Sequence, residues 1–187
     1  MNRWIKFILV FIAVIISGIV ILLRHISPDQ ALNLNYTEVP LGERALEMVR
    51  HQSLDLVLTE DDINNFVKEG LARKADYRPG VSITGARIHL AGERLIADLN
   101  IKVFGRIDIG LAVTYRLEWK EPDLVATAQE ARVKSLVLPK ALFDDFLIPI
   151  GSGLPKPLKV QSVLVGDDQM TIRLQKPRLR DLRELFG

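Results

Sequence analysis

Apolar and polar positions alternate over residues 95–119, and this pattern predicts β-strands rather than helices. From Leu95 to Trp119 every odd-numbered residue is apolar or glycine, and most even-numbered residues are polar. One strand of that length would span about 80 Å at about 3.3 Å per residue, which is far longer than strands in globular proteins. We therefore expect a hairpin whose three-residue loop is Phe104-Gly105-Arg106, because that loop keeps the odd residues of both arms on one face.

The strands on either side are expected to extend the same sheet. Upstream, Ile83 and Ile88 are out of phase, and Gly85 between them predicts a β-bulge. Downstream, the turn "KEPDL" is followed by a strand whose odd positions are expected to face the apolar side. These positions are Val125, Thr127, Gln129, Ala131 and Val133. Residues 158–165 and 170–175 predict a closing hairpin.

Three stretches have helical periodicity or helix-start signals. Residues 41–50 predict a short helix, and residues 60–71 predict a second one, with Thr59 as N-cap and three acidic residues in its first turn. A third helix is expected over 139–147, with Pro139 in its first turn. A single sheet cannot leave its apolar face in water. The expected fold class is therefore α+β, with a curved antiparallel sheet packed on two or three helices.

The N-terminus predicts a transmembrane helix. Residues Phe7 to Leu23 contain no charged side chain and would form about 26 Å of helix, enough to cross a hydrocarbon core. Trp4 suits the headgroup zone at the end of this anchor. A cleaved signal peptide is the alternative, but it would have a shorter apolar core and a small-residue cleavage site. Arg3 and Lys6 precede the span, which favours a cytoplasmic N-terminus.

These signals divide the chain into five segments. They are a cytoplasmic N-terminus (1–6), a transmembrane anchor (7–23), a stalk (24–40), an extracytoplasmic α+β domain (41–175) and a basic amphipathic tail (176–187). The expected location is therefore the cell membrane, with a single pass.

Composition excludes several classes of function. The chain has no cysteine, which excludes disulfides, thiolate nucleophiles and Cys-ligated zinc. A net charge of +2 with 6% aromatic residues argues against nucleic-acid binding. None of the three histidines has a partner at metal-ligand spacing, and no glycine-rich phosphate loop is present. We therefore predict a protein that is not an enzyme and uses no metal or cofactor.

Three stretches carry a resemblance to known families: "LTEDDINNF", "LVLPKALFDDFL" and "VGDDQMTIRL". Together with the anchor, they make residues 1–175 similar to the YpmS-like family of membrane-anchored bacterial proteins of unknown function. More distantly, the chain resembles small bacterial TULIP-like domains, the tubular lipid-binding group. The resemblance implies a curved sheet wrapped on helices, with an apolar groove able to hold acyl chains.

Two hypotheses of function follow. In the first, the protein binds a membrane lipid or another hydrophobic ligand, because the apolar sheet face extends beyond what two short helices can cover. The expected groove residues are Tyr115, Leu117, Trp119, Val125, Thr127 and Gln129, with Leu142, Phe143 and Phe146 on a helix opposite them. In the second, the apolar face is a filled core, and the protein is a structural or interaction protein of the cell envelope that binds another envelope protein.

Overall fold

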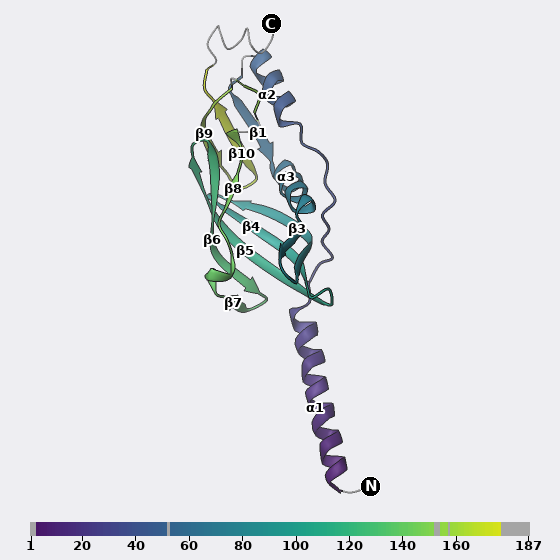
Figure 1. Cartoon of the computed structure of the whole chain (residues 1–187). Coiled ribbons are helices and arrows are strands. Elements are labelled where there is room, and N and C mark those ends of the chain that lie inside the picture. The colour runs from purple at the N-terminus through teal and green to yellow at the C-terminus, as the bar shows by residue number, and fades with distance from the viewer. Residues whose placement is uncertain (1–2, 52, 152–153, 157, 177–187) are drawn as a thin grey trace.

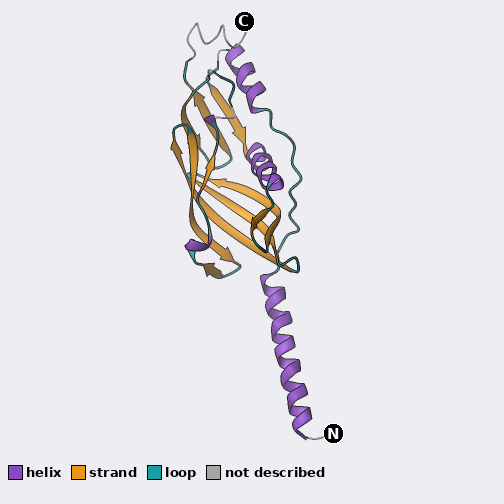
Figure 2. Cartoon of the chain, viewed as in Figure 1, coloured by secondary structure: helices purple, strands orange, loops and turns teal. Residues whose placement is uncertain are grey.

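The computed structural model describes residues 3–51, 53–151, 154–156 and 158–176, and it shows one long helix below an α+β domain (Figure 1). Figure 2 separates the helices from the strands. The helices are α1 (Arg3–Ile26), α2 (Leu41–Arg50), α3 (Glu60–Arg73) and the 3₁₀ turn η1 (Lys140–Leu142). The strands are β1 (Asp55–Thr59), β2 (Asp76–Arg78), β3 (Val81–Ala91), β4 (Arg94–Val103), β5 (Ile107–Lys120), β6 (Asp123–Val133), β7 (Leu136–Leu138), β8 (Phe146–Ile148), β9 (Val160–Val165) and β10 (Gln169–Leu174). The predicted tail lies outside the described residues beyond Lys176.

The main sheet is a strongly curved antiparallel meander in the order β2-β3-β4-β5-β6-β7, and β8 also pairs with β6. The predicted hairpin is confirmed, because Val103 pairs with Ile107 across the loop at residues 104–106. The predicted bulge is also confirmed, because the β3–β4 register shifts between Ile83 and Gly85. The α+β fold class with a curved antiparallel sheet is therefore correct.

A second, three-stranded sheet in the order β1-β10-β9 and the helices α2 and α3 complete the domain. Helix α3 begins as predicted: the Thr59 hydroxyl accepts a hydrogen bond from the Asp62 N–H, and the Asp62 carboxylate accepts one from the Thr59 N–H. This capping box fixes the junction between β1 and α3. The helix predicted over residues 41–50 is also present, as α2.

The helix expected over residues 139–147 is wrong. After Pro139 the chain makes only the short turn η1, and then extends into β8, where Phe146 pairs with Ala126. Strand β7 pairs only with residues 131–133 of β6, so the backbone groups of residues 124–128 along the same edge are free to bond this segment. In addition, Asp145 Oδ1 accepts a hydrogen bond from Ala128 N at 2.8 Å. A helix would lose these bonds, and Pro149 would end it within a few residues.

The connection after α1, predicted as a stalk over residues 24–40, contacts the domain. Helix α1 continues to Ile26, and residues 27–39, here called the strap, lie along the domain. The strap crosses a row in which Asn100 pairs with Gly85 on one side and Gly110 on the other. A Cβ on Gly85 would lie 2.3 Å from the Leu32 carbonyl carbon, and one on Gly110 would lie 2.8 Å from Pro28 Cα. The two glycines therefore give the strap its path.

Polar side chains also cover the open edge of β3. The Asn64 side chain bonds both the N–H and the C=O of Ile88 at 2.7 Å, and Glu60 accepts from Leu90 N at 3.0 Å. Further along this edge, Ala86 N donates to the Asn33 carbonyl of the strap at 3.3 Å. These bonds satisfy backbone groups that would otherwise template another strand.

Candidate functional site

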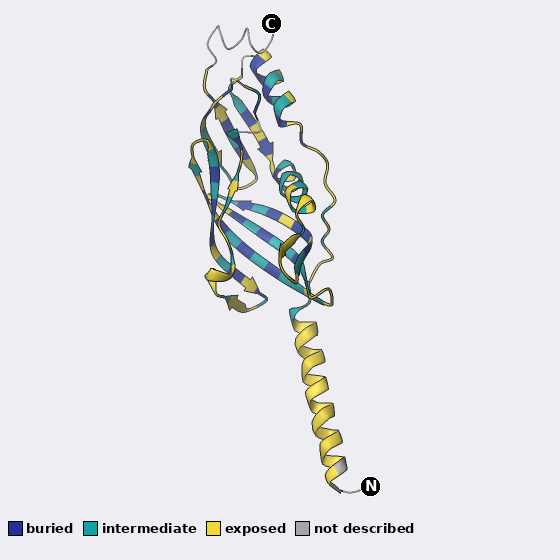
Figure 3. Ribbon diagram, viewed as in Figure 1, coloured by how far each residue is buried: buried dark blue, intermediate teal, exposed yellow. Residues whose placement is uncertain are grey.

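The main sheet has one apolar face, and half of it is filled core. Within the half that lies far from α1, here called the α1-distal half, most large side chains of the sheet are almost completely covered, and Trp119 near the end of β5 is half-buried. Leu90, Leu95, Leu117 and Leu124 are 5%, 1%, 5% and 1% exposed. They belong to one cluster with residues of α2, α3, β1 and β10. This half is therefore packed protein interior (Figure 3).

The half of the same face that lies near α1, here called the α1-proximal half, is less completely covered. Ile83 and Leu111 are buried there, but several large apolar residues pack against the core and remain half-exposed. They are Leu99, Ile101, Ile109, Leu138 and Phe143, which are half-buried rather than fully buried. At the end of the domain next to α1, Phe104 in the β4–β5 loop and Leu136 and Val137 in β7 are exposed apolar residues. A partly covered apolar surface of this kind is the part of the fold suited to a hydrophobic ligand.

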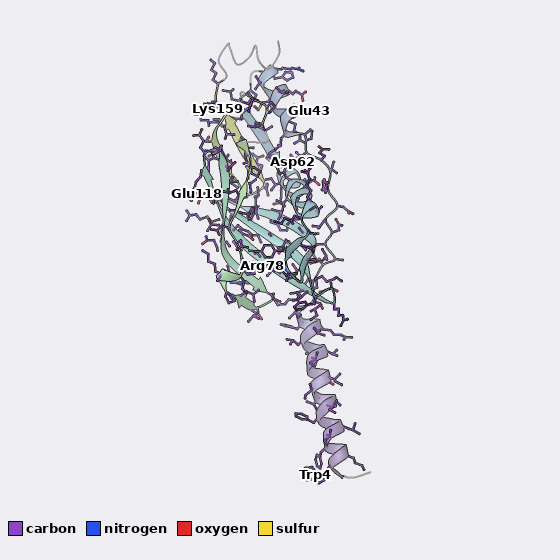
Figure 4. All side chains as sticks on the ribbon, in the orientation of Figure 1. Trp4, Glu43, Asp62, Arg78, Glu118 and Lys159 are labelled. Atoms are coloured by element: carbon purple, nitrogen blue, oxygen red, sulfur yellow. The ribbon has the colours of Figure 1, made fainter. Side chains whose placement is uncertain are left out.

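A polar contact joins opposite edges of the curved sheet across this face. Asp144, between η1 and β8, accepts hydrogen bonds from the Tyr77 hydroxyl at 3.0 Å and from Arg78 Nη2 at 2.9 Å. The Asp144 N–H donates back to the Tyr77 hydroxyl at 3.2 Å. Tyr77 and Arg78 belong to β2, at the opposite edge of the sheet from β8. We call these three residues the clasp; Figure 4 shows Arg78 in the lower part of the domain, toward α1.

Electrostatics favour a closed clasp. The pKa of the Asp144 carboxyl is lowered by the hydrogen bonds from Arg78 and Tyr77, and the pKa of Arg78 is raised mainly by its hydrogen bond to Asp144. Both groups are therefore charged at neutral pH. The Arg78 guanidinium also lies 5.1 Å from the centre of the Tyr77 ring.

Tyr115 pairs with Leu95 of the filled core, and the clasp residues Tyr77 and Asp144 lie near it. It is 9% exposed, and its ring meets Phe146 edge-on with centroids 4.9 Å apart. Burial, together with smaller contributions from the nearby Tyr77, Asp144 and Asp145, raises the pKa of its phenol to about 12. Tyr115 therefore stays neutral at physiological pH and closes the end of the filled core.

The predicted groove residues do not all share one face. Tyr115 and Leu117 are buried, and Trp119 is half-buried on the apolar face. Val125 and Thr127 pair with Glu118 and Arg116, and therefore lie on the outer face. The reason is a bulge that the sequence pattern did not reveal. Thr114 pairs with Glu130 but Tyr115 pairs with Ala128, which leaves Gln129 unpaired and reverses the alternation of β6.

The residues predicted on a third helix are also separated. Leu142 is 46% exposed on η1, Phe143 is half-buried in the α1-proximal half, and Phe146 packs on Tyr115 from β8. The clasp was missed altogether, because 67 residues separate Tyr77 from Asp144 and no local spacing links them. Leu99, Ile101 and Ile109 were predicted only as odd-numbered residues of the apolar face.

The outer face carries a polar depression of about 540 Å³, lined by Glu93, Arg94, Thr114, Arg116, Gln129 and Glu130. Its lining contains both signs of charge, which does not suit an acyl chain. Within the described part of the chain, no three His, Cys, Asp or Glu side chains gather as a metal site.

Helix α1 ends directly at the α1-proximal half. Its segment Lys6–Ile26 is long and apolar enough to be a single membrane span or a signal sequence. Its side chains from Phe7 to Leu23 are exposed, whereas Ile26 packs against the core. The anchor residues predicted from the sequence, Trp4, Phe7 and Leu23, all belong to this helix.

Comparison with known proteins identifies the domain. A family model described as LmeA-like phospholipid-binding matches residues 29–175, which include most of the strap, α2, α3 and both sheets. No curated protein and no solved structure matches the chain. The resemblance to YpmS-like proteins stays a prediction, while the TULIP-like lipid-binding fold agrees with the match. The chain therefore belongs to the LmeA-like phospholipid-binding family.

Proposed function

We propose that the protein is a membrane-anchored, extracytoplasmic module that holds the acyl chains of a phospholipid against the α1-proximal half of its apolar face. The observation that carries the proposal is the partial cover of Leu99, Ile101 and Ile109, on the side of the domain where α1 ends. Membership of a phospholipid-binding family supports the same ligand class.

The chemistry of the α1-proximal half suits an acyl chain. Each methylene group of an acyl chain that leaves water contributes about 0.8 kcal/mol to the free energy of binding. The half-buried residues of this face offer the chain aliphatic and aromatic side chains to pack against. The clasp links the two edges of the sheet across this face, so we assign it the role of retaining the lipid. The proposal requires binding and release only, without a catalytic step.

The membrane anchor supplies the ligand. We assign α1 as an uncleaved single membrane span, and the uncharged run from Phe7 to Leu23 supports this assignment. Arg3 and Lys6 before the span support a cytoplasmic N-terminus, so that the domain lies outside the cytoplasm. In this arrangement the α1-proximal half opens next to the lipid that it binds.

A photoactivatable phospholipid with a diazirine on its acyl chain tests the proposal in the full chain, reconstituted into vesicles. After illumination, mass spectrometry maps the crosslinked peptides. We expect crosslinks on α1, from surrounding lipid, and also on β4 and β5 near Leu99, Ile101 and Ile109. Crosslinks confined to α1 would overturn lipid binding by the domain and favour the envelope-interaction hypothesis.

A matched pair of variants makes the test specific. Ile101 is half-buried on the apolar face, and Val125 is half-buried on the outer face. Ile101→Glu should remove the crosslinks on β4 and β5, because a carboxylate there repels an acyl chain. Val125→Glu should leave them unchanged. Both variants should keep the crosslinks on α1, and circular dichroism should show that both are folded.

A further inference from the structure

We infer that the end of the domain next to α1 is inserted into the same membrane that holds α1, with Phe104 as the leading side chain. This surface, here called the rim, consists of Phe104 in the β4–β5 loop, Leu136 and Val137 in β7, and Leu142 in η1. The inference rests on the membrane anchor of the proposed function, but it concerns a surface that lipid binding alone does not require.

The chain leaves no room for a spacer between the span and the rim. Leu23 ends the uncharged run, and Pro28 already packs against Gly110 of β5. Residues 24–27 lie between them and span only about 10 Å, because residues 24–26 still belong to the helix and only residue 27 lies outside it. The headgroup layer of one leaflet is itself about 5–8 Å thick. The strap then holds the domain in this position, because it is bonded along β3 and β4 by Asn33 and Gln30.

Three separate segments at this end of the domain, the β4–β5 loop, β7 and η1, expose apolar side chains (Figure 1). Phe104 is 78% exposed, Leu136 62%, Val137 56% and Leu142 46%. Soluble surfaces rarely gather side chains of this size without a partner. Because α1 emerges beside them, a lipid bilayer is the occupant that the fold brings to this surface.

Phe104 is held exposed at a conformational cost. Its φ is +49°, a left-handed conformation that favours Gly, Asn or Asp in hairpin loops. Its N–H donates to the Gly80 carbonyl at 2.7 Å, and its ring covers Gly80, where a Cβ would lie 2.8 Å from Phe104 Cε1. Asn would suit the turn better, so turn formation does not account for an aromatic residue. Strained exposed positions of this kind point to function.

Unpaired cations flank the apolar residues. Arg106 follows Phe104 by two positions, Lys140 precedes Leu142 by two, and Arg24 lies in the last turn of α1. Among the described residues, none of these three has an ion pair within 4 Å, whereas Lys102 pairs with Asp108. Cations beside a shallow apolar surface suit the phosphate groups of lipids at an interface.

The absence of cysteine allows single-site labelling of the full chain to test the rim. Bimane is attached to Phe104→Cys or Leu136→Cys in nanodiscs that contain phosphatidylglycerol and spin-labelled quencher lipids. Ile12→Cys in α1 reports the span, and Glu43→Cys reports the opposite end of the domain (Figure 4). We expect bimane at 104, 136 and 12 to lose most of its fluorescence, and bimane at 43 to keep it.

A second variant separates insertion from folding. Phe104→Asn suits the left-handed turn, so the hairpin should fold normally. With bimane at residue 136, this substitution should remove a large part of the quenching. Leu164→Asn is the matched control, because Leu164 is an exposed apolar residue of β9, outside the rim. It should leave the quenching at 136 unchanged.

The outcomes separate the inference from the proposed function. Quenching at 12 without quenching at 104 and 136 would overturn insertion of the rim and leave the anchor intact. No quenching at 12 would overturn the membrane anchor itself. A blue shift at 104 that needs a second copy of the chain in the nanodisc, without lipid quenching, would overturn insertion in favour of self-association.

Discussion

The two halves of the apolar face have the same sequence pattern and different surroundings. Leu95 and Leu99 are both on β4 and point to the same face, four residues apart. Leu95 is 1% exposed and belongs to the core cluster that includes residues of α3 and the three-stranded sheet, whereas Leu99 is only half-buried. Alternation therefore tells which residues leave water, but it does not tell what replaces the water. In the α1-distal half the replacement is protein, and in the α1-proximal half we propose that it is lipid.

The largest expected effect comes from exchanging these two leucines for alanine. Leu95→Ala should lower the free energy of unfolding by about 2–5 kcal/mol, the usual cost of a cavity in a filled core. Leu99→Ala should cost less, because its side chain is already partly in water. Urea unfolding of the full chain in detergent measures both. Equal losses would mean that the two halves are packed alike.

In the phospholipid crosslinking experiment we expect the opposite order, with the larger effect from Leu99→Ala and the smaller one from Leu95→Ala. Leu99→Ala should reduce crosslinks on β4, because it removes part of the proposed lipid-binding surface. Leu95→Ala should leave crosslinks per folded molecule unchanged. A reduction by Leu95→Ala alone would place the lipid in the α1-distal half, contrary to the proposal.

The second effect concerns the clasp that crosses the face. Asp144→Asn removes the charge that Arg78 and Tyr77 bind, and Asp144 is exposed, so the folded state should lose little stability. If the clasp retains the lipid, exchange of a fluorescent phospholipid out of the domain should become several-fold faster. Asp55→Asn is the control, because it breaks a comparable contact with Arg173 on the three-stranded sheet. Equal exchange rates in both variants would exclude a retaining role.

Much of the fold follows from the sequence because its signals are local. The capping residue Thr59, the bulge at Gly85 and the loop at residues 104–106 each depend on neighbouring residues. The helix predicted over 139–147 failed because a non-local contact, the open edge of β6, competes with a weak helical tendency. The path of the strap across the sheet likewise depends on Gly85 and Gly110, which are far from the strap in sequence.

The candidate site was harder to predict, for two physical reasons. One unpaired residue, Gln129, reverses the side on which Val125 and Thr127 lie, and nothing in the composition of β6 marks that bulge. In addition, the clasp and the partial cover of Leu99 depend on how strongly the sheet curves. Sheet curvature is a property of the whole meander rather than of a short stretch.

The clasp also gives a pH dependence. Hydrogen bonds from Arg78 and Tyr77 lower the pKa of Asp144 below its ordinary value of 3.8. A lowered pKa means that the contact contributes fully above the ordinary value and is lost as pH falls through the lowered one. Lipid exchange from the wild-type chain should therefore accelerate only below about pH 4. Asp144→Asn should exchange lipid rapidly at all pH values and lack this transition. A transition of equal size in that variant would assign it to another carboxyl group.

The smallest expected effect is a pH dependence of folding stability that arises from Tyr115. Burial raises the pKa of its phenol to about 12, so between its ordinary value of 10 and that value the unfolded chain loses the proton first. Folding stability should therefore fall with rising pH in this window, and Tyr115→Phe should remove that part of the fall. The absorbance difference at the phenolate band between wild type and Tyr115→Phe isolates this one side chain. If Tyr115 closes the filled core, adding phospholipid should leave its titration in place, because no ligand reaches the ring. A titration that moves when phospholipid is added would instead make Tyr115 part of the lipid-binding surface and extend that surface past the clasp.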